Sequence, residues 1–267
     1  MRTTGKIYIL IIMLIIGLTV QAQDTTNVRR QPPTPEQMAA FRKAMQERLR
    51  NDWAFLARYR DDNAKFGAPG AGEERVIFYG NSITDFWINI MPEFFAGKPY
   101  IDRGISGQTT PQMLVRLRQD VINLKPKVVV ILAGINDING NTGPSTLEMI
   151  EDNIQSMAEL ARASNIQVVL SSVLPCDSIY VRPDLHPAER VLLLNVWLKK
   201  YAADNQCVYL DYFPSLANEK NGLKEEYTND GIHPNKAGYE VMAPLAEAAV
   251  KKAMGISGNN AQNGPPL

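Results

Sequence analysis

The sequence has little of the material from which metal sites and disulfide frameworks are built. Its 267 residues include 2 cysteines and 2 histidines, and neither Cys-x-x-Cys nor His-x-x-x-His occurs. Charge of one sign is not in excess either, because 28 Lys and Arg offset 28 Asp and Glu. A neutral balance argues against a dedicated nucleic-acid binder, and 45% hydrophobic residues argue against a disordered chain. We therefore expect a globular protein without a metal, a cofactor or a nucleic-acid partner.

Long apolar runs are also scarce, and the one that stands out lies at the N-terminus. Arg2 and Lys6 form a basic start, residues 7–20 are mostly apolar, and Val20-Gln21-Ala22 offers a small-residue cleavage pattern. The run is shorter than the ~20 residues that a transmembrane helix needs. We predict a signal peptide over residues 1–22 and an exported protein, periplasmic or extracellular, with no stable membrane anchor after cleavage. A retained membrane anchor is the alternative.

The segments flanking the main domain differ in character. Residues 23–72 are expected to hold a flexible, Pro-rich lead-in and then a helix over Pro35–Lys65, which has an apolar series at three- and four-residue steps: Met38, Phe41, Met45, Leu49, Trp53 and Leu56. We expect this helix to pack on its own domain; dimerisation is the alternative. Residues 73–256 form the predicted domain, and residues 257–267 (SGNNAQNGPPL) read as a disordered tail.

Within the domain, strand-like and helix-like segments alternate. Strands are predicted at residues 75–79, 99–102, 127–132, 166–173 and 207–211, and helices at residues 111–121, 144–163, 187–203 and 234–254, with a further helix starting near Ser82. Such alternation predicts right-handed crossovers and a parallel sheet that is covered on both faces. Cys176 follows the fourth strand and Cys207 opens the fifth, so the two lie at opposite sheet edges and no disulfide is expected.

Four short polar motifs follow or approach strand ends, where parallel sheets bind ligands. They are Gly80-Asn81-Ser82-Ile83-Thr84, residues 103–109 (RGISGQT), Gly134-Ile135-Asn136-Asp137 and Asp230-Gly231-Ile232-His233. Taken singly, each has a plain structural alternative: Ser82 or Asp230 as a helix cap, and the others as turns. Together they supply a hydroxyl, an imidazole, an orienting carboxylate and oxyanion donors, which are the parts that nucleophilic acyl transfer requires.

These motifs resemble the four ordered blocks of the SGNH (GDSL-type) hydrolases, from about Val76 to Ala249. The resemblance implies a three-layer α/β/α sandwich with a five-stranded, flavodoxin-like parallel sheet, and ester hydrolysis through an acyl-enzyme. It implies Ser82 as the nucleophile, His233 as the general base and then acid, and Asp230 as its orienter. It also implies an oxyanion hole made of the Ser82 N–H, the Gly107 N–H and the Asn136 side chain. The second block is similar to the platelet-activating-factor acetylhydrolase-like and lysophospholipase-like branches.

The chain departs from that family pattern at one position. The family usually has Asp before the serine, whereas this chain has Asn81, which keeps the hydrogen-bonding shape but removes a charge. The triad carboxylate comes from Asp230, so we expect the nucleophile to remain active. Gly-x-Ser-x-Gly is absent because Ile83 and Thr84 follow Ser82, which argues against an α/β-hydrolase elbow.

The substrate is the least constrained part of the prediction. Export and a neutral surface favour a secreted serine esterase that removes short (acetyl) groups from glycans, or from a small-molecule ester. A lysophospholipase or thioesterase-type acylhydrolase is the alternative enzyme, and a non-catalytic glycan-binding module on the same fold is the alternative from another class. Phe86, Trp87, Ile88 and Ile90 could line an acyl pocket, although helix packing is the favoured role. The second histidine, His186, is expected to be a loop or cap residue.

Overall fold

Five short segments form one parallel sheet in the computed structural model, which describes residues 34–178 and 186–262. They are β1 (Val76–Gly80), β2 (Tyr100–Gly104), β3 (Val128–Leu132), β4 (Gln167–Ser171) and β5 (Val208–Leu210). Their spatial order is β2-β1-β3-β4-β5, with all pairs parallel. Every residue of β1 and β3 is buried, because central strands of a doubly covered sheet face helices on both sides. The predicted five-stranded, flavodoxin-like sheet is confirmed.

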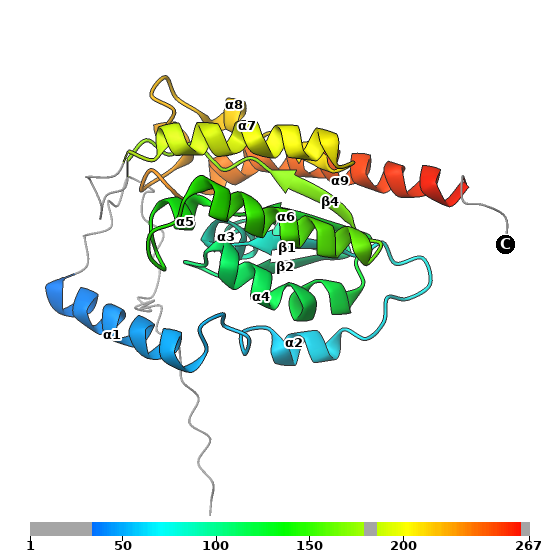
Figure 1. The fold of residues 1–267 in the computed structure, drawn as a ribbon, viewed down its shortest axis with the longest axis horizontal. Helices are drawn as coiled ribbons and strands as arrows, with labels where there is room; N and C mark the ends of the chain where they lie inside the picture. Colours follow the sequence, from blue (N-terminus) through cyan, green and yellow to red (C-terminus); the bar gives the residue numbers. More distant parts are fainter. Residues whose placement is uncertain (1–33, 179–185, 263–267) are drawn as a thin grey trace, which may run out of the picture. The chain divides into compact units, whose positions relative to one another are not determined.

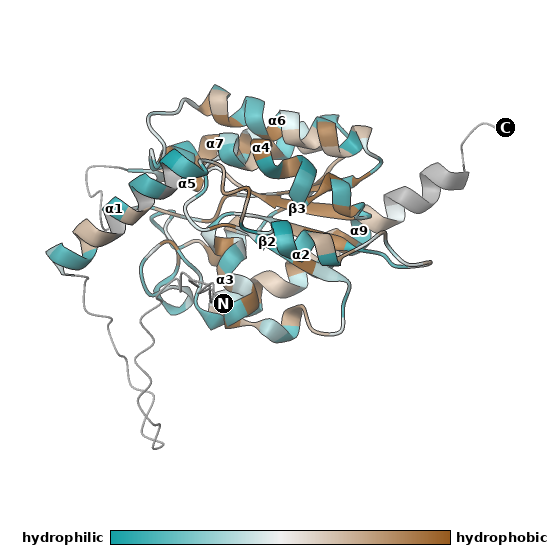
Figure 2. Ribbon diagram, turned by 90° about the horizontal axis from the view of Figure 1, so that it is seen from below, coloured by the Kyte–Doolittle hydropathy of each residue, from teal (hydrophilic) through white to brown (hydrophobic). Residues whose placement is uncertain are grey.

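Helices cover both faces of this sheet, which gives three layers (Figures 1 and 2). One face carries α4 (Thr110–Asp120), α6 (Leu147–Ala163) and α7 (Ala188–Asp204). The other carries α3 (Ser82–Ile90) and α9 (Lys236–Gln262). Helix α6 turns an apolar stripe inward, and its buried residues are Ile150, Ile154, Met157, Ala158 and Ala161. Short elements join the layers: α5 (Ile135–Ile138), α8 (Phe213–Leu216), and 3-10 turns at Pro92–Phe94, Ile122–Leu124 and Glu225–Tyr227.

The segment expected to be one helix over Pro35–Lys65 is two helices, so that prediction is wrong. Helix α1 (Pro35–Asn51) ends before Asp52, and residues 52–59 separate it from α2 (Arg60–Lys65). The Asp52 carboxylate accepts the Leu56 and Ala57 N–H groups, both at 2.8 Å, which offers the backbone an alternative to continued helix. Phe55 has a φ of 57°, outside the helical range.

The other end of the chain also differs from expectation. Helix α9 continues to Gln262 and therefore includes residues 257–262 of the expected disordered tail. Extending an existing helix adds one hydrogen bond for each residue that is ordered, which is far less costly than starting a new helix. The predicted signal peptide (residues 1–22), most of the lead-in and residues 263–267 lie outside the described residues.

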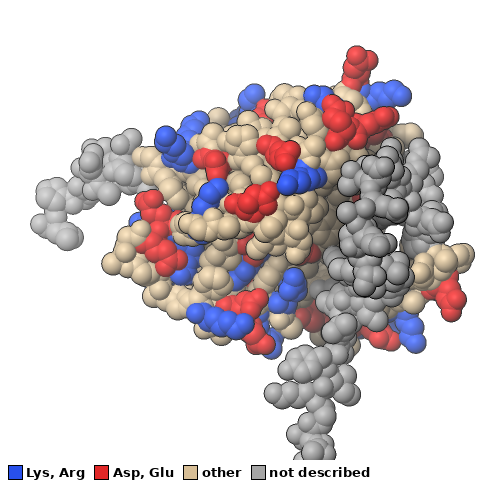
Figure 3. Space-filling view, turned by 180° about the vertical axis from the view of Figure 1, so that it is seen from behind, with Lys and Arg blue, Asp and Glu red and all other residues tan. Residues whose placement is uncertain are grey.

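Cys176 and Cys207 are both free thiols and not partners in a disulfide. The Cys176 Sγ lies 3.5 Å from the Ser178 carbonyl oxygen, and the Cys207 Sγ lies 3.5 Å from the Asn205 carbonyl oxygen. None of the helices in residues 34–178 and 186–262 combines the length and apolar character needed to cross a bilayer. Figure 3 shows acidic and basic side chains intermixed over one face of the molecule, in line with the zero net charge of the chain.

Candidate active site

The strand register brings three of the four motifs to one edge of the sheet. Gly80, the last residue of β1, pairs with Gly104 of β2 on one side and with Leu132 of β3 on the other. Ser82 lies two residues beyond Gly80, Gly107 three residues beyond Gly104 and Asn136 four residues beyond Leu132. Since all three strands run in the same direction, their following loops leave the sheet side by side.

Ser82 occupies the first turn of α3, directly after the cap. The cap is Asn81, whose Oδ1 accepts the Ile83 N–H at 3.0 Å, so the predicted alternative of Ser82 as a cap does not hold. Ser82 is 6% exposed. The turn is possible because Gly104 has no side chain: a Cβ there would lie 2.0 Å from the Asp85 N of α3. The positive end of the helix therefore reaches the serine, where it favours developing negative charge.

The fourth motif reaches Ser82 from more than 140 residues away. The Ser82 Oγ lies 2.9 Å from His233 Nε2, and His233 Nδ1 lies 2.7 Å from Asp230 Oδ2. A carboxylate only accepts hydrogen bonds, so the neutral ring must carry its proton on Nδ1 and leave Nε2 as the acceptor for the serine hydroxyl. The structure thus brings the three predicted triad residues into hydrogen-bonding series.

A tight turn fixes the Asp230 carboxylate in this position. Its Oδ1 accepts the N–H groups of Ile232 (2.9 Å) and His233 (2.8 Å), while the Thr228 hydroxyl donates to the His233 carbonyl at 2.8 Å. Partial burial raises the Asp230 pKa, but the hydrogen bonds from the His233 ring and from the backbone outweigh it and hold the pKa well below the usual range for Asp. Asp230 therefore remains ionised at neutral pH, beside the His233 ring.

Contacts between α9 and α3 fix the histidine loop relative to the serine. The Tyr239 hydroxyl of α9 donates to the Ile83 carbonyl at 2.7 Å, and the Tyr239 ring stacks on Trp87 with 5.2 Å between centroids. Phe86 lies beside the His233 ring at a centroid distance of 5.2 Å. Of the four residues weighed for an acyl pocket, Trp87 is a core residue at 2% exposure, Ile90 packs on the core and Ile88 is exposed, whereas Phe86 lies beside a triad residue.

The three predicted oxyanion donors lie on the converging loops. Gly107 is half-buried with a φ of +80°, a conformation that side chains disfavour. Asn136 is 7% exposed, and its Nδ2 donates one hydrogen to the Gln108 carbonyl at 2.9 Å; within residues 34–178 and 186–262 the second hydrogen remains available to another acceptor. Ser106, next to Gly107, is tied to α3 because its N–H donates to Asp85 Oδ2 at 3.1 Å.

Two residues with supporting roles were not assigned from the sequence. Asp137 accepts the Thr110 N–H (3.0 Å) and hydroxyl (2.6 Å), which joins the third motif to the start of α4. Burial raises the pKa of Asp137 to about 6, against the lowering effect of those hydrogen bonds. Arg116, fully buried on α4, donates to the Gly80 carbonyl at 2.9 Å. In the sequence, Asp137 is part of the third motif, whereas Arg116 has no feature that distinguishes it from other residues of the helix predicted at residues 111–121.

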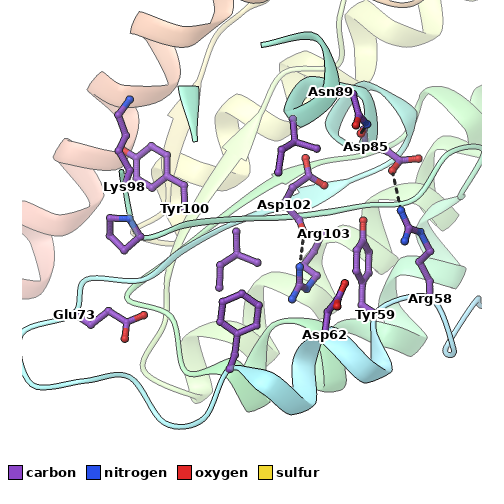
Figure 4. Close-up of a pocket in the computed structure, with 14 residues that line it drawn as sticks. Arg58, Tyr59, Asp62, Glu73, Asp85, Asn89, Lys98, Tyr100, Asp102 and Arg103 are labelled. Carbon is purple, nitrogen blue, oxygen red and sulfur yellow. Dashed lines mark hydrogen bonds and ion pairs between the residues drawn. The ribbon is translucent and has the colours of Figure 1, made fainter. Parts of the chain in front are cut away.

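A pocket of about 370 Å³ lies along the outer edge of β2 and is separate from the triad (Figure 4). Figure 4 shows Arg58 reaching Asp85 and Arg103 folding back onto the Asp102 carbonyl. Ser82, Asp230 and His233 are not among its lining residues, and exposed Ile88 lines it instead. Burial, with a smaller contribution from the Asp85 charge, raises the pKa of Asp102 to about 7. Among the described residues, no group of three or more His, Cys, Asp or Glu could hold a metal ion.

Known proteins with related sequences share this architecture. A candidate acylhydrolase from Bacteroides fragilis is 44% identical with a TM-score of 0.75, over 76% of this chain and 99% of that one. A GDSL-like lipase from Bacteroides thetaiotaomicron is 42% identical with a TM-score of 0.74, over 76% of this chain and 100% of that one. An acetyl xylan esterase at 24% identity and a TM-score of 0.57 (66% of this chain, 99% of that one) shares the fold.

Two curated relatives match a smaller part of the chain. The lipoprotein YqeF of Bacillus subtilis is 28% identical over 126 residues, 41% of this chain and 52% of that protein. The human platelet-activating factor acetylhydrolase IB subunit alpha2 is 29% identical over 108 residues, 39% of this chain and 45% of that protein. The chain thus spans about half the length of the curated relatives that it matches. Residues 78–241 match the sequence profile of the GDSL-like Lipase/Acylhydrolase family. The chain belongs to the GDSL-like lipase/acylhydrolase family.

Proposed function

We propose that the protein is a serine esterase that hydrolyses carboxylic esters through an acyl-enzyme on Ser82. One observation carries the proposal: the unbroken series from Ser82 Oγ through His233 to the Asp230 carboxylate, with contacts of 2.9 and 2.7 Å. Both distances lie within the hydrogen-bonding range that proton transfer requires. In this proposal no metal or cofactor takes part, because the three side chains supply nucleophile, base and orienting charge.

In the first half of the reaction, Ser82 Oγ attacks the ester carbonyl while its proton passes to His233 Nε2. Asp230 stabilises the imidazolium that results, because its carboxylate already holds Nδ1–H. The tetrahedral oxyanion accepts hydrogen bonds from the Ser82 and Gly107 N–H groups and from the second hydrogen of Asn136 Nδ2. Each such donor contributes about 10²–10³-fold to turnover.

The tetrahedral intermediate then collapses, and the alcohol leaves with the proton from His233, which completes the first half and leaves the acyl group on Ser82. In the second half, water takes the position of the alcohol, gives a proton to the same nitrogen and attacks the acyl carbon. The second tetrahedral intermediate collapses, His233 returns that proton to Ser82 Oγ, and the carboxylic acid leaves. His233 thus acts first as base and then as acid in each half.

For the substrate, we propose short acyl groups, acetyl above all, carried on a glycan. The leaving alcohol must lie next to His233, whose side chain is 28% exposed, and the Asp230 side chain beside it is 50% exposed. A large alcohol can extend from this open side into solvent. The zero net charge also suits a neutral carbohydrate better than an anionic membrane surface.

The experiment compares p-nitrophenyl esters of increasing acyl length and measures acetate release from acetylated oligosaccharides. We expect the highest kcat/KM for acetate, release of acetate from sugars, and loss of both in Ser82→Ala, which should fold normally. A preference for long chains would instead support the lysophospholipase or thioesterase alternative. A folded protein whose Ser82 does not react with a fluorophosphonate would be a non-catalytic glycan-binding module.

Export is part of the same proposal and has its own test. The basic start, the apolar run and the small-residue pattern at residues 20–22 support cleavage before Gln23. Expression of the full chain in a bacterial host should give a mature protein in the periplasm or medium whose N-terminal sequencing begins at Gln23. An N-terminus at Met1 in the membrane fraction would favour the retained anchor instead.

A further inference from the structure

The Asn136 side chain can serve as an oxyanion donor only if its amide group is held in one orientation. An amide on a free χ2 rotation would present Nδ2 or Oδ1 to the oxyanion, and the second would repel it. In this structure one hydrogen of Nδ2 is used to fix the group, because it donates to the Gln108 carbonyl at 2.9 Å. The position of the Gln108 backbone therefore sets the position of the remaining hydrogen.

Gln108 itself is held from two sides through its side chain, which is 1% exposed. Its Oε1 accepts the Nε–H of Arg116 at 2.5 Å, and its Nε2 donates to the Ala54 carbonyl at 2.8 Å. Ala54 belongs to the segment between α1 and α2, which lies before the family match at residues 78–241. A flanking segment thus contacts the oxyanion loop directly.

Arg116 connects this clamp to the strand ends that carry the other site residues. Its guanidinium donates to the carbonyls of Gly80 and Arg103, each at 2.9 Å, and pairs with Asp120 at 3.1 Å. It is fully buried and lies over the Tyr79 ring at 4.3 Å. Because one rigid, planar group contacts the ends of β1 and β2 as well as Gln108, the loop that follows β2 is fixed relative to the nucleophile.

We propose that Gln108 is a positioning residue for the Asn136 oxyanion donor, and that the Ala54 carbonyl of the flanking segment completes the brace that holds it. Gln108 does not touch substrate; it acts through Asn136. The inference rests on the proposed function, since it assumes that Asn136 stabilises an oxyanion. It adds two residues, Gln108 and Ala54, that belong neither to the triad nor to the oxyanion donors.

The test uses two matched variants of the full chain, Gln108→Met and Gln119→Met. In both variants methionine, which has a similar shape, replaces a glutamine whose Nε2 donates to a carbonyl of the same flanking segment. Gln108 donates to the Ala54 carbonyl, and Gln119 donates to the Leu56 carbonyl at 2.9 Å. Only Gln108 also holds the Asn136 amide. We expect kcat on p-nitrophenyl acetate to fall about 10- to 100-fold in Gln108→Met with KM within about twofold, because a donor misplaced by about 1 Å loses most of its effect. Gln119→Met should keep kcat within about twofold.

A second readout does not depend on catalysis. The side-chain amide signals of Asn136 in ¹H–¹⁵N spectra, assigned by their loss in Asn136→Asp, should shift or broaden in Gln108→Met and stay in place in Gln119→Met. Unchanged Asn136 signals in folded Gln108→Met, or equal losses of kcat in the two variants, would overturn the proposal. If Gln108→Met does not fold, Gln108→Glu is used, which keeps an acceptor for Arg116 and removes the donor to Ala54; wild-type kcat in that variant would overturn the role of Ala54.

The two proposals fail in different ways. If the esterase assignment is wrong, the wild-type protein hydrolyses no ester and its Ser82 is not labelled by a fluorophosphonate, yet the Asn136 signals still report the brace. If only the brace is wrong, the wild type is active and Gln108→Met is as active as the wild type.

Discussion

Replacing Asp102 with Asn should change how the stability of this protein depends on pH. Asp102 is 7% exposed; its Oδ1 accepts the Gly104 N–H at 2.8 Å, and its Oδ2 has no hydrogen-bond partner among the described residues. Asparagine keeps the acceptor for Gly104 and replaces the unpartnered oxygen. The substitution therefore removes a titrating group without removing a hydrogen bond.

The size of the effect follows from the pKa. Burial raises the pKa of Asp102 from 3.8 to about 7 in the folded protein. In the unfolded chain the group ionises as the pH passes its ordinary value, whereas in the folded chain it stays protonated until about pH 7, so the folded state loses stability over this window as the pH rises. The difference between the ordinary pKa of Asp and a value of about 7 corresponds to at most about 4 kcal/mol of free energy of unfolding.

Chemical denaturation at about pH 4 and about pH 8 measures the effect. As the pH rises from about 4 to about 8, the free energy of unfolding of the wild type should fall by as much as about 4 kcal/mol relative to that of Asp102→Asn. Because each protein is compared with itself at two pH values, any effect of the amide on stability that does not depend on pH cancels. The reasoning is refuted if the difference in free energy of unfolding between the two proteins is the same at both pH values, or if the wild type becomes more stable relative to the variant as the pH rises.

The remaining predictions concern the site itself. His233→Ala should abolish ester hydrolysis while His186→Ala, an exposed residue, retains it; the reverse would mean that the other histidine is the base. Asp230→Asn should lower kcat about 10⁴-fold by releasing the imidazole tautomer, as kinetics on p-nitrophenyl acetate would show. Asn136→Ala should lower kcat about 10²–10³-fold with little change in KM, and an unchanged kcat would remove it from the oxyanion hole. Gly104→Ala should cost about 3 kcal/mol or more in denaturant, because its Cβ would lie 2.0 Å from the Asp85 N.

Most of the sheet could be predicted because buried parallel strands are continuous apolar runs. β1 and β3, with every residue buried, matched their predicted segments within about one residue at each end. The break between α1 and α2 could not be predicted in the same way. It depends on the Asp52 carboxylate capping two N–H groups, and the apolar spacing around it remained that of a continuous helix. A periodic pattern reports which face is apolar, not whether the backbone stays helical.

The candidate site divides along similar lines. The triad residues and Asn136 could be proposed because their side chains carry reactive or hydrogen-bonding groups and lie in motifs that resemble those of a known family. Gly107 could be proposed because it stands in one of these motifs. The brace around Gln108 could not, because it depends on two main-chain carbonyls: that of Ala54, which accepts from the Gln108 side chain, and that of Gln108, which accepts from the Asn136 side chain. Any residue type at position 54 offers the same carbonyl. Interactions between a side chain and a distant backbone group therefore leave no pattern in a single sequence.

Asn81, which replaces the usual Asp of the family, caps the helix that begins with Ser82. The Oδ1 of Asn81 caps α3 at 3.0 Å, a role that Asp and Asn fill equally well. The two residues differ at the other atom: Asn81 is fully buried, and its Nδ2 has no hydrogen-bond partner among the described residues. Aspartate would place an unpaired carboxylate oxygen there, next to Ser82, and burying an unpaired charge costs more than burying the unpaired amide nitrogen. Asn81 thus keeps the cap of the serine turn, and the carboxylate that contacts the His233 ring is that of Asp230.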